Sequence, residues 1–242
     1  VSNNHTGIFK MSEDHGASWH GCPGGDDNPS LGCAASLDGD GYYFIPDAVW
    51  DDLVETQFSY NYVDECDGTS AFLGSFWTYY NPDFKLDRNG NPHFVIQVLP
   101  CDDDPDGFCY YANESGIYHF TIDKEYLDNP GPVNTLTGWN WKFAITGLDT
   151  WQWADMLGDS YVWNTHSSLA FSTEDPDFMY IVTNMATQGS FAGDEANLED
   201  PCYFAIWSDY PEWSEDVYVI KSEDGGETWS NPLNVTDTPD ES

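Results

Sequence analysis

The chain has 242 residues, and its 43 acidic side chains against 6 basic ones give a formal net charge of −37. So few cations argue against nucleic acid and anionic membrane surfaces as partners, because both are bound through Lys and Arg. An aromatic content of 17%, with 11 Trp, argues against disorder, because disordered chains are poor in aromatic residues.

Short strands are the elements that the sequence predicts, taken in chain order. Apolar residues alternate with polar ones over 7–11, 117–122 and 141–145, which is the period of a half-buried strand. Residues 84–87 and 92–99 flank Arg88-Asn-Gly-Asn, and an Asn-Gly pair between two such runs predicts a hairpin. Residues 149–158 are expected to form one short helix.

A second set of strands follows in the same order. Residues 168–172 and 178–183 flank a turn at 173–177, and residues 216–221 form a further apolar run. In both sets a long acidic insertion follows the second strand. The two sets therefore read as copies of one unit.

One short motif occurs twice, each time after an apolar strand. It reads Ser12-Glu-Asp14-His-Gly16-Ala-Ser18-Trp19 (box 1) and Ser222-Glu-Asp224-Gly-Gly226-Glu-Thr228-Trp229 (box 2). The shared pattern resembles the Asp-box, or BNR, repeat of sialidase-like β-propellers. The resemblance implies that each box forms the turn between the third and fourth strands of a propeller blade.

The residue types of the motif suit a structural role. An Asp in a tight turn accepts hydrogen bonds from nearby backbone N–H groups, and Gly adopts a positive φ without steric cost. The Ser or Thr can tie the turn together, and the Trp is expected to fill space between neighbouring sheets. Asp14 and Asp224 are therefore expected to stabilise the fold and to take no part in catalysis.

The predicted fold class is all-β, with β-propeller blades of four antiparallel strands. Residues 1–35 would end one blade, residues 66–148 would form a second, with a degenerate box after 117–122, and residues 160–236 would form a third. That is about two and a half blades, whereas a closed propeller has at least about four, so further blades are expected on the same or another chain. A β-sandwich is the alternative, because short alternating strands fit both architectures.

An even number of cysteines predicts disulfides and an oxidising compartment, so the protein is expected to be secreted, extracellular or on the cell surface. They are Cys22, Cys33, Cys66, Cys101, Cys109 and Cys202. The most local pairing joins Cys101 to Cys109 and Cys22 to Cys33, which leaves Cys66 with Cys202. No apolar run approaches about 18 residues, so no membrane insertion is expected.

The acidic loop between Cys101 and Cys109 is the best candidate for a metal site. Calcium takes six to eight oxygen ligands, and clustered aspartates in a turn can supply several of them. The candidate ligands are Asp102, Asp103, Asp104 and Asp106. The alternative is a solvated loop pinned by a disulfide, and Asp38-Gly-Asp40-Gly is a weaker second candidate. Calcium is the one cofactor that the sequence suggests.

Sialidases, the enzymes that the resemblance implies first, bind the substrate carboxylate with three arginines. This chain has one arginine, Arg88, so no catalytic residue is assigned. The leading hypothesis is a secreted, non-catalytic propeller that serves as a scaffold or as a binding module for glycan or protein. The alternative is a sialidase-like or other glycoside hydrolase whose active site is completed by sequence outside this chain. Trp139, Trp141, Trp151 and Trp153 could stack on sugars in that case, or pack between sheets.

Overall fold

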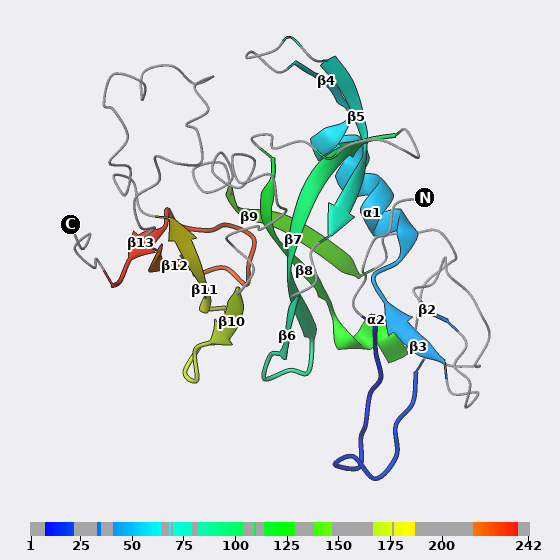
Figure 1. Ribbon diagram of the computed structural model, residues 1–242. Helices are drawn as coiled ribbons and strands as arrows, with labels where there is room; N and C mark the ends of the chain where they lie inside the picture. The colour runs from blue at the N-terminus through cyan, green and yellow to red at the C-terminus, as the bar shows by residue number, and fades with distance from the viewer. Residues whose placement is uncertain are drawn as a thin grey trace.

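Three antiparallel sheets and a few short helical segments make up the described part of the chain (Figure 1). The computed structural model describes residues 8–21, 33–34, 41–63, 68, 70–78, 82–103, 109, 114–128, 138–146, 167–175, 177–186 and 215–236. Strands predominate over helices, so the expected β-rich fold class is confirmed at that level.

The central sheet has six strands in the order β4-β5-β7-β8-β9, and β6 pairs with the first half of β7. β5 pairs with the second half of β7, so β5 and β6 share one edge of that strand. The bounds are β4 Tyr60–Val63, β5 Ser70–Thr78, β6 Asp83–Leu86, β7 Pro92–Asp102, β8 Gly116–Ile122 and β9 Trp139–Thr146. The predicted Asn-Gly hairpin is therefore confirmed as β6–β7.

A four-stranded sheet follows in simple chain order, β10-β11-β12-β13, and each strand is antiparallel to the next. A small three-stranded sheet at the N-terminal end has the order β1-β3-β2. The bounds are β10 Ser168–Phe171, β11 Met179–Ala186, β12 Glu215–Ser222, β13 Leu233–Asn234, β1 Ile8–Phe9, β2 Cys33–Ala34 and β3 Tyr42–Phe44. The strands predicted from the sequence are confirmed to within a few residues at their ends.

Helical structure occurs where the sequence analysis did not expect it. Helix α1 spans Asp47–Leu53 and continues into a π-helical turn, η2, over Val54–Phe58. Val49, Trp50 and Leu53 are buried along one face of α1, which is the spacing of an amphipathic helix. A short helix, α2 at Lys124–Asp128, follows β8 in the place of the degenerate box. The helix expected at 149–158 lies outside the described residues.

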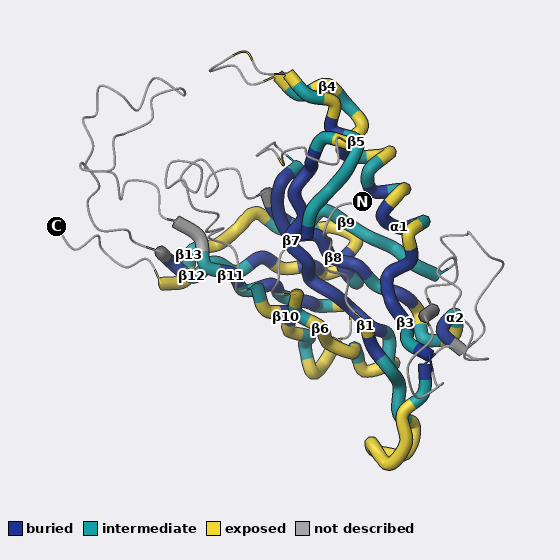
Figure 2. The backbone as a smooth tube through the Cα atoms, turned by 45° about the vertical axis from the view of Figure 1, so that its right-hand side comes forward, coloured by how far each residue is buried: buried dark blue, intermediate teal, exposed yellow. Residues whose placement is uncertain are grey.

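The middle strands of the central sheet, β7 and β8, are buried on both faces (Figure 2). Because side chains alternate along a strand, Phe94 and Ile96 face a first core that β1, β3 and α1 complete. Val95 faces a second core, which we call the junction, between the central and four-stranded sheets. Its members are Val95, Ile117, Ile145, Leu169, Met179, Ile181 and Ile220. The junction joins residues far apart in the sequence.

Candidate functional site

Box 1 is held together by hydrogen bonds within its own eight residues. The Ser18 N–H donates to Asp14 Oδ1 at 2.8 Å, and the Ser18 hydroxyl donates to Asp14 Oδ2 at 2.6 Å. The Ser12 hydroxyl donates to Asp14 Oδ1 at 2.9 Å and accepts the Gly16 N–H at 2.7 Å. The carboxylate therefore organises the whole turn.

Box 2 repeats this network bond for bond. Asp224 accepts the Thr228 N–H at 2.9 Å and the Thr228 hydroxyl at 2.6 Å, on separate carboxylate oxygens. The Ser222 hydroxyl donates to Asp224 at 2.8 Å and accepts the Gly226 N–H at 2.8 Å. Box 2 lies between β12 and β13, the third and fourth strands of their sheet.

Both boxes also share an unusual backbone path. The fifth residue of each, Gly16 and Gly226, has a φ of 90° and 94°, and the residue before it, His15 or Gly225, has a φ of 59° and 73°. Two consecutive residues in the left-handed region disfavour most side chains. The glycine of the motif is thus required by its backbone conformation.

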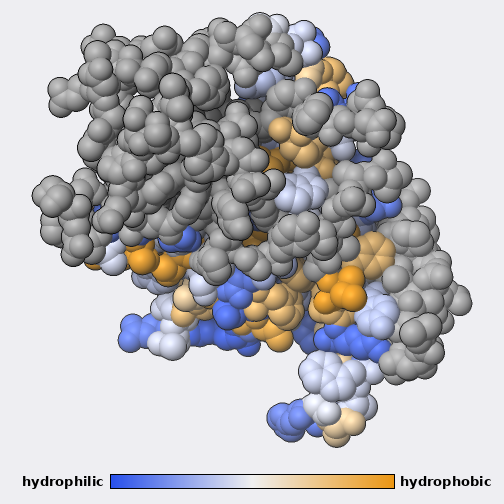
Figure 3. All heavy atoms as spheres, viewed as in Figure 1, coloured by the Kyte–Doolittle hydropathy of each residue, from blue (hydrophilic) through white to orange (hydrophobic). Residues whose placement is uncertain are grey.

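The surroundings of the two boxes differ. Box 1 forms the tip of a hairpin that projects from the body, and its Trp19 is 56% exposed (Figure 2). That tip carries mainly hydrophilic residues (Figure 3). Trp229 of box 2 instead packs against the junction, with its ring 5.6 Å from that of His119. The expectation that the motif Trp fills space between sheets holds for Trp229 and is wrong for Trp19, because no second sheet among the described strands covers the projecting hairpin.

Acid is expected to weaken both boxes between about pH 4 and pH 2. Hydrogen bonds from Ser18 and Thr228 lower the pKa of Asp14 and of Asp224 from 3.8 to about 2. A carboxylate with a lowered folded-state pKa stabilises the fold fully above its unfolded pKa, and that stability is lost as the pH falls toward 2. Melting curves of Asp224→Asn should therefore change less than those of the wild type over this interval. Asp51→Asn, at an exposed position in α1, is the control and should keep the wild-type slope.

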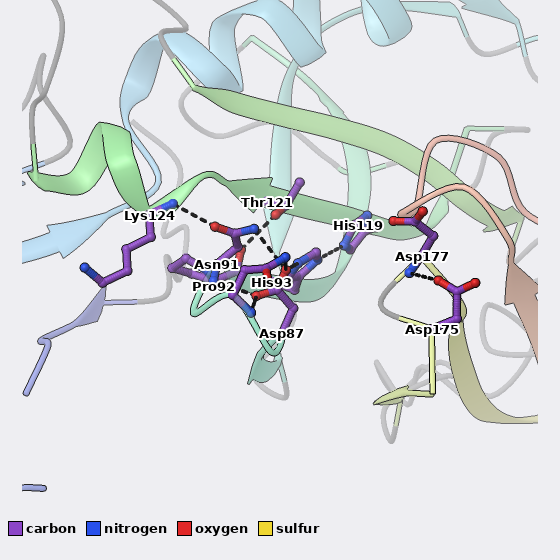
Figure 4. A network of polar contacts seen from close by, with 10 residues as sticks. Asp87, Asn91, Pro92, His93, His119, Thr121, Lys124, Asp175 and Asp177 are labelled. Carbon is purple, nitrogen blue, oxygen red and sulfur yellow. Dashed lines mark hydrogen bonds and ion pairs between the residues drawn. The ribbon is translucent and has the colours of Figure 1, made fainter. Parts of the chain in front are cut away.

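A buried histidine pair lies where box 2 meets the central sheet (Figure 4). His93 Nδ1 and His119 Nε2, on neighbouring strands β7 and β8, are 2.8 Å apart and share one hydrogen bond. Their ring centroids are 5.1 Å apart with the ring planes nearly parallel, and Phe171 of β10 meets His93 edge-on at 5.0 Å. Gly226 lies directly over His119, with no room for even a methyl group between them.

The turn before β7 continues this polar network toward box 1 (Figure 4). Asp87 accepts the N–H groups of Asn89 and Asn91, each at 2.8 Å, and its Oδ2 lies 3.9 Å from His93 Nε2. Asn91 Oδ1 accepts the Lys124 N–H at 2.8 Å, and Lys124 Nζ lies 3.7 Å from Glu13 of box 1. Polar contacts thus link Asp87 to box 1, whereas the buried His93 Nε2 has no hydrogen-bond partner in the described part of the chain. The histidine pair gives no signal in the sequence, because only the pairing of β7 with β8 brings the two rings together.

Burial keeps both histidines neutral. It lowers the pKa of His93 well below its usual range, while Asp87 and Asp123 act in the opposite direction. Burial likewise lowers the pKa of His119, the nearby His93 adds to this effect, and a backbone hydrogen bond with Gly226 opposes it. The pair has no open face to solvent, so its arrangement suits a structural contact better than general acid–base chemistry.

The one arginine is engaged in the fold. Arg88 Nη2 donates to the Thr173 carbonyl oxygen at 2.7 Å, which ties the β6–β7 turn to the β10–β11 turn. Glu227 of box 2 makes a comparable link, because it accepts from Asn140 and lies 3.0 Å from Lys142, both on β9. These contacts connect the central sheet to the turns of the four-stranded sheet.

A tyrosine–glutamate pair is the arrangement in the described residues closest to catalytic chemistry. The Tyr60 hydroxyl donates to Glu114 Oε2 at 2.6 Å, and the Tyr118 hydroxyl donates to the Glu114 carbonyl oxygen at 2.7 Å. Burial and then the hydrogen bond to Glu114 raise the pKa of Tyr60 above its usual range. A phenol held in its neutral form acts as a donor and is a poor nucleophile.

The two described tryptophans among those proposed as sugar platforms are partly buried and pack against the first core. Trp139 lies against Phe94 in the first core, and Trp141 lies against Tyr118 while its Nε1 donates to Asp52 at 2.8 Å. Trp151 and Trp153 lie outside the described residues.

The acidic loop is only partly described. Cys101 and Cys109 form the predicted disulfide, whereas the other two proposed pairings involve residues outside the description. Asp102 ends β7 and Asp103 follows it, while Asp104, Asp106 and the Asp38-Gly-Asp40 segment are not among the described residues. In the part that the structure covers, no group of three His, Cys, Asp or Glu side chains could hold a metal ion. The calcium site stays a prediction.

Removing this disulfide should lower stability by about 2–3 kcal/mol, because an eight-residue separation closes a short loop in the unfolded chain. We expect the double variant Cys101→Ser/Cys109→Ser to melt at a lower temperature than the wild type. Strong reductant should lower the melting temperature of the wild type further than that of the double variant. Identical curves for the wild type and the double variant would show that the bond contributes nothing.

Comparison with known proteins returned no match among protein-family models, curated proteins or solved structures. Among the described helices, none is long and apolar enough to cross a membrane.

Proposed function

We propose that this chain supplies consecutive blades of an Asp-box β-propeller in a secreted or cell-surface protein. The propeller would serve as a non-catalytic scaffold or as a binding module for glycan or protein. The observation that carries this proposal is the stacking of two four-strand meanders, β6-β7-β8-β9 and β10-β11-β12-β13, across one apolar junction. Box 2 lies in the last turn of the second meander, as in a blade of that family.

The first strands of the two meanders support the proposal further. Asp83 of β6 accepts the Leu169 N–H at 2.7 Å and the Ser168 hydroxyl at 3.3 Å, both on β10. β6 and β10 therefore lie side by side. Blades arranged around a central channel place equivalent strands next to one another in this way.

The engaged side chains favour a scaffold over an enzyme. Arg88 is used to join two turns, and Tyr60 is held as a neutral donor to Glu114. Neither is free to bind or attack a sugar. The Cys101–Cys109 disulfide fits an oxidising compartment, where such bonds persist.

A binding and activity screen tests the functional part, on the longest natural chain that contains this sequence. We expect that chain to bind at least one glycan or extracellular protein, and to release no sugar from a panel of glycosides that includes sialosides. Release of sugar above the buffer rate would contradict the proposal and favour the glycoside-hydrolase alternative.

An experimental structure of the same longer chain tests the architecture. Successive sheets should be related by rotation about one axis. Two sheets closed into a single sandwich would contradict the propeller.

A further inference from the structure

The histidine pair is the one place in the described fold where titratable groups are buried inside an otherwise apolar contact between sheets. His93 and His119 are 6% and 1% exposed. They are flanked by Phe171 of β10 and by Gly226 and Trp229 of box 2. The two histidine rings therefore form the part of the junction that contacts box 2.

The hydrogen bond between the rings depends on their protonation state. At 2.8 Å, one facing nitrogen must carry the proton and the other must offer its lone pair. A neutral pair meets this condition. Full protonation places two N–H groups head to head and buries two positive charges, which is costly without paired anions.

We infer that the His93–His119 pair is an acid-sensitive latch: in its neutral form it holds box 2 and β12 against β8, and its protonation releases them. The inference does not depend on whether the sheets belong to a propeller, because it uses only the contact between the two sheets.

The charged groups around the pair do not remove this sensitivity. On the central sheet, Asp87 lies 3.9 Å from His93 and Asp123 follows β8, and both favour protonation of His93. On the opposite side the groups that meet the rings, namely Phe171, Met179, Gly226 and Trp229, carry no charge. Asp177 lies next to Gly225, and among the described residues no carboxylate contacts the His119 ring itself to stabilise its protonated form.

Acidification from pH 7 to pH 5 should favour the open junction strongly. Each histidine that stays neutral in the closed junction but has an ordinary pKa near 6.5 in the open one shifts the equilibrium toward the open junction. At pH 5 this factor is about 30-fold for each such histidine. Carboxylates remain largely ionised at pH 5, so the effect in this interval belongs to the histidines.

Amide hydrogen exchange, corrected for the intrinsic effect of pH, measures this opening. We expect exchange in β8 and β12 of the wild type to become more than tenfold faster between pH 7 and pH 5. Exchange in β5, which lies outside the junction, should change far less. A rise of equal size in β5 would mean that the whole chain unfolds, and would overturn the latch.

The matched variant is His93→Asn/His119→Gln. Asn places an amide nitrogen or oxygen near the position of Nδ1, and Gln places one near that of Nε2, so the bond can persist while neither side chain titrates. This variant should lose most of the acid-dependent exchange. His20→Gln, in the projecting hairpin, is the control and should behave as the wild type. An undiminished acid response in the double variant would overturn the inference.

A spectroscopic measurement on the wild type covers the case in which the double variant does not fold. The chain has six histidines. Two of their Cε1 NMR signals should remain in the neutral position in the folded protein down to pH 5. Titration of all six near pH 6.5, with the fold intact, would overturn the latch.

Discussion

Replacing Gly226 with alanine should lower the free energy of unfolding by about 3–4 kcal/mol. Its φ of 94° is strained for any side chain, and a Cβ would lie 2.4 Å from His119 Cε1 and 2.7 Å from Met179 Cε. His119 is packed between His93 and Trp229, so it cannot move aside without opening the junction. The backbone strain and the steric overlap therefore both lower the free energy of unfolding.

Gly16→Ala is the matched control. Gly16 has nearly the same φ, 90°, but the nearest atom to its added Cβ would be Trp19 Cζ2 at 3.7 Å. Only the backbone cost applies there, about 1–2 kcal/mol. Comparing the free energies of unfolding of the two variants in denaturant therefore distinguishes the cost of the backbone strain, which both share, from the cost of the overlap with His119, which only Gly226→Ala has. Equal losses would show that His119 yields freely and that the junction is loosely packed.

Replacing Trp229 with alanine should destabilise the fold by about 2–3 kcal/mol, below the usual range for a fully buried aromatic side chain, because its ring is only partly buried. The ring packs against the junction and meets His119 edge-on at 5.6 Å. Its loss removes the contacts of this ring with the junction and with His119.

Trp19→Ala provides the comparison at the same motif position. Trp19 is 56% exposed on the projecting hairpin, so its removal should change the free energy of unfolding by less than about 1 kcal/mol. Equilibrium unfolding in denaturant measures both. A loss at Trp19 as large as that at Trp229 would mean that box 1 is covered by a partner in solution.

Several local features could be predicted from the sequence because their causes lie within a few residues. The alternation in 117–122 and the Asn-Gly pair at 89–90 predict β8 and the β6–β7 hairpin, and both form. Helix α1 was missed because its apolar face is short and no side chain caps its first turn. A search for the spacing of Val49, Trp50 and Leu53 would have found it.

The amino-acid sequence by itself indicated most strands through their alternation, and it determined the turns of box 1 and box 2, because eight consecutive residues contain every donor and acceptor involved. Only the tertiary structure decided that Trp229 is packed and Trp19 exposed, and that His93 meets His119 beneath Gly226. The physical reason is that burial depends on which sheets stack against each other. That stacking is a property of residues distant in the chain, and two copies of one motif can therefore fold alike and differ in what they hold together.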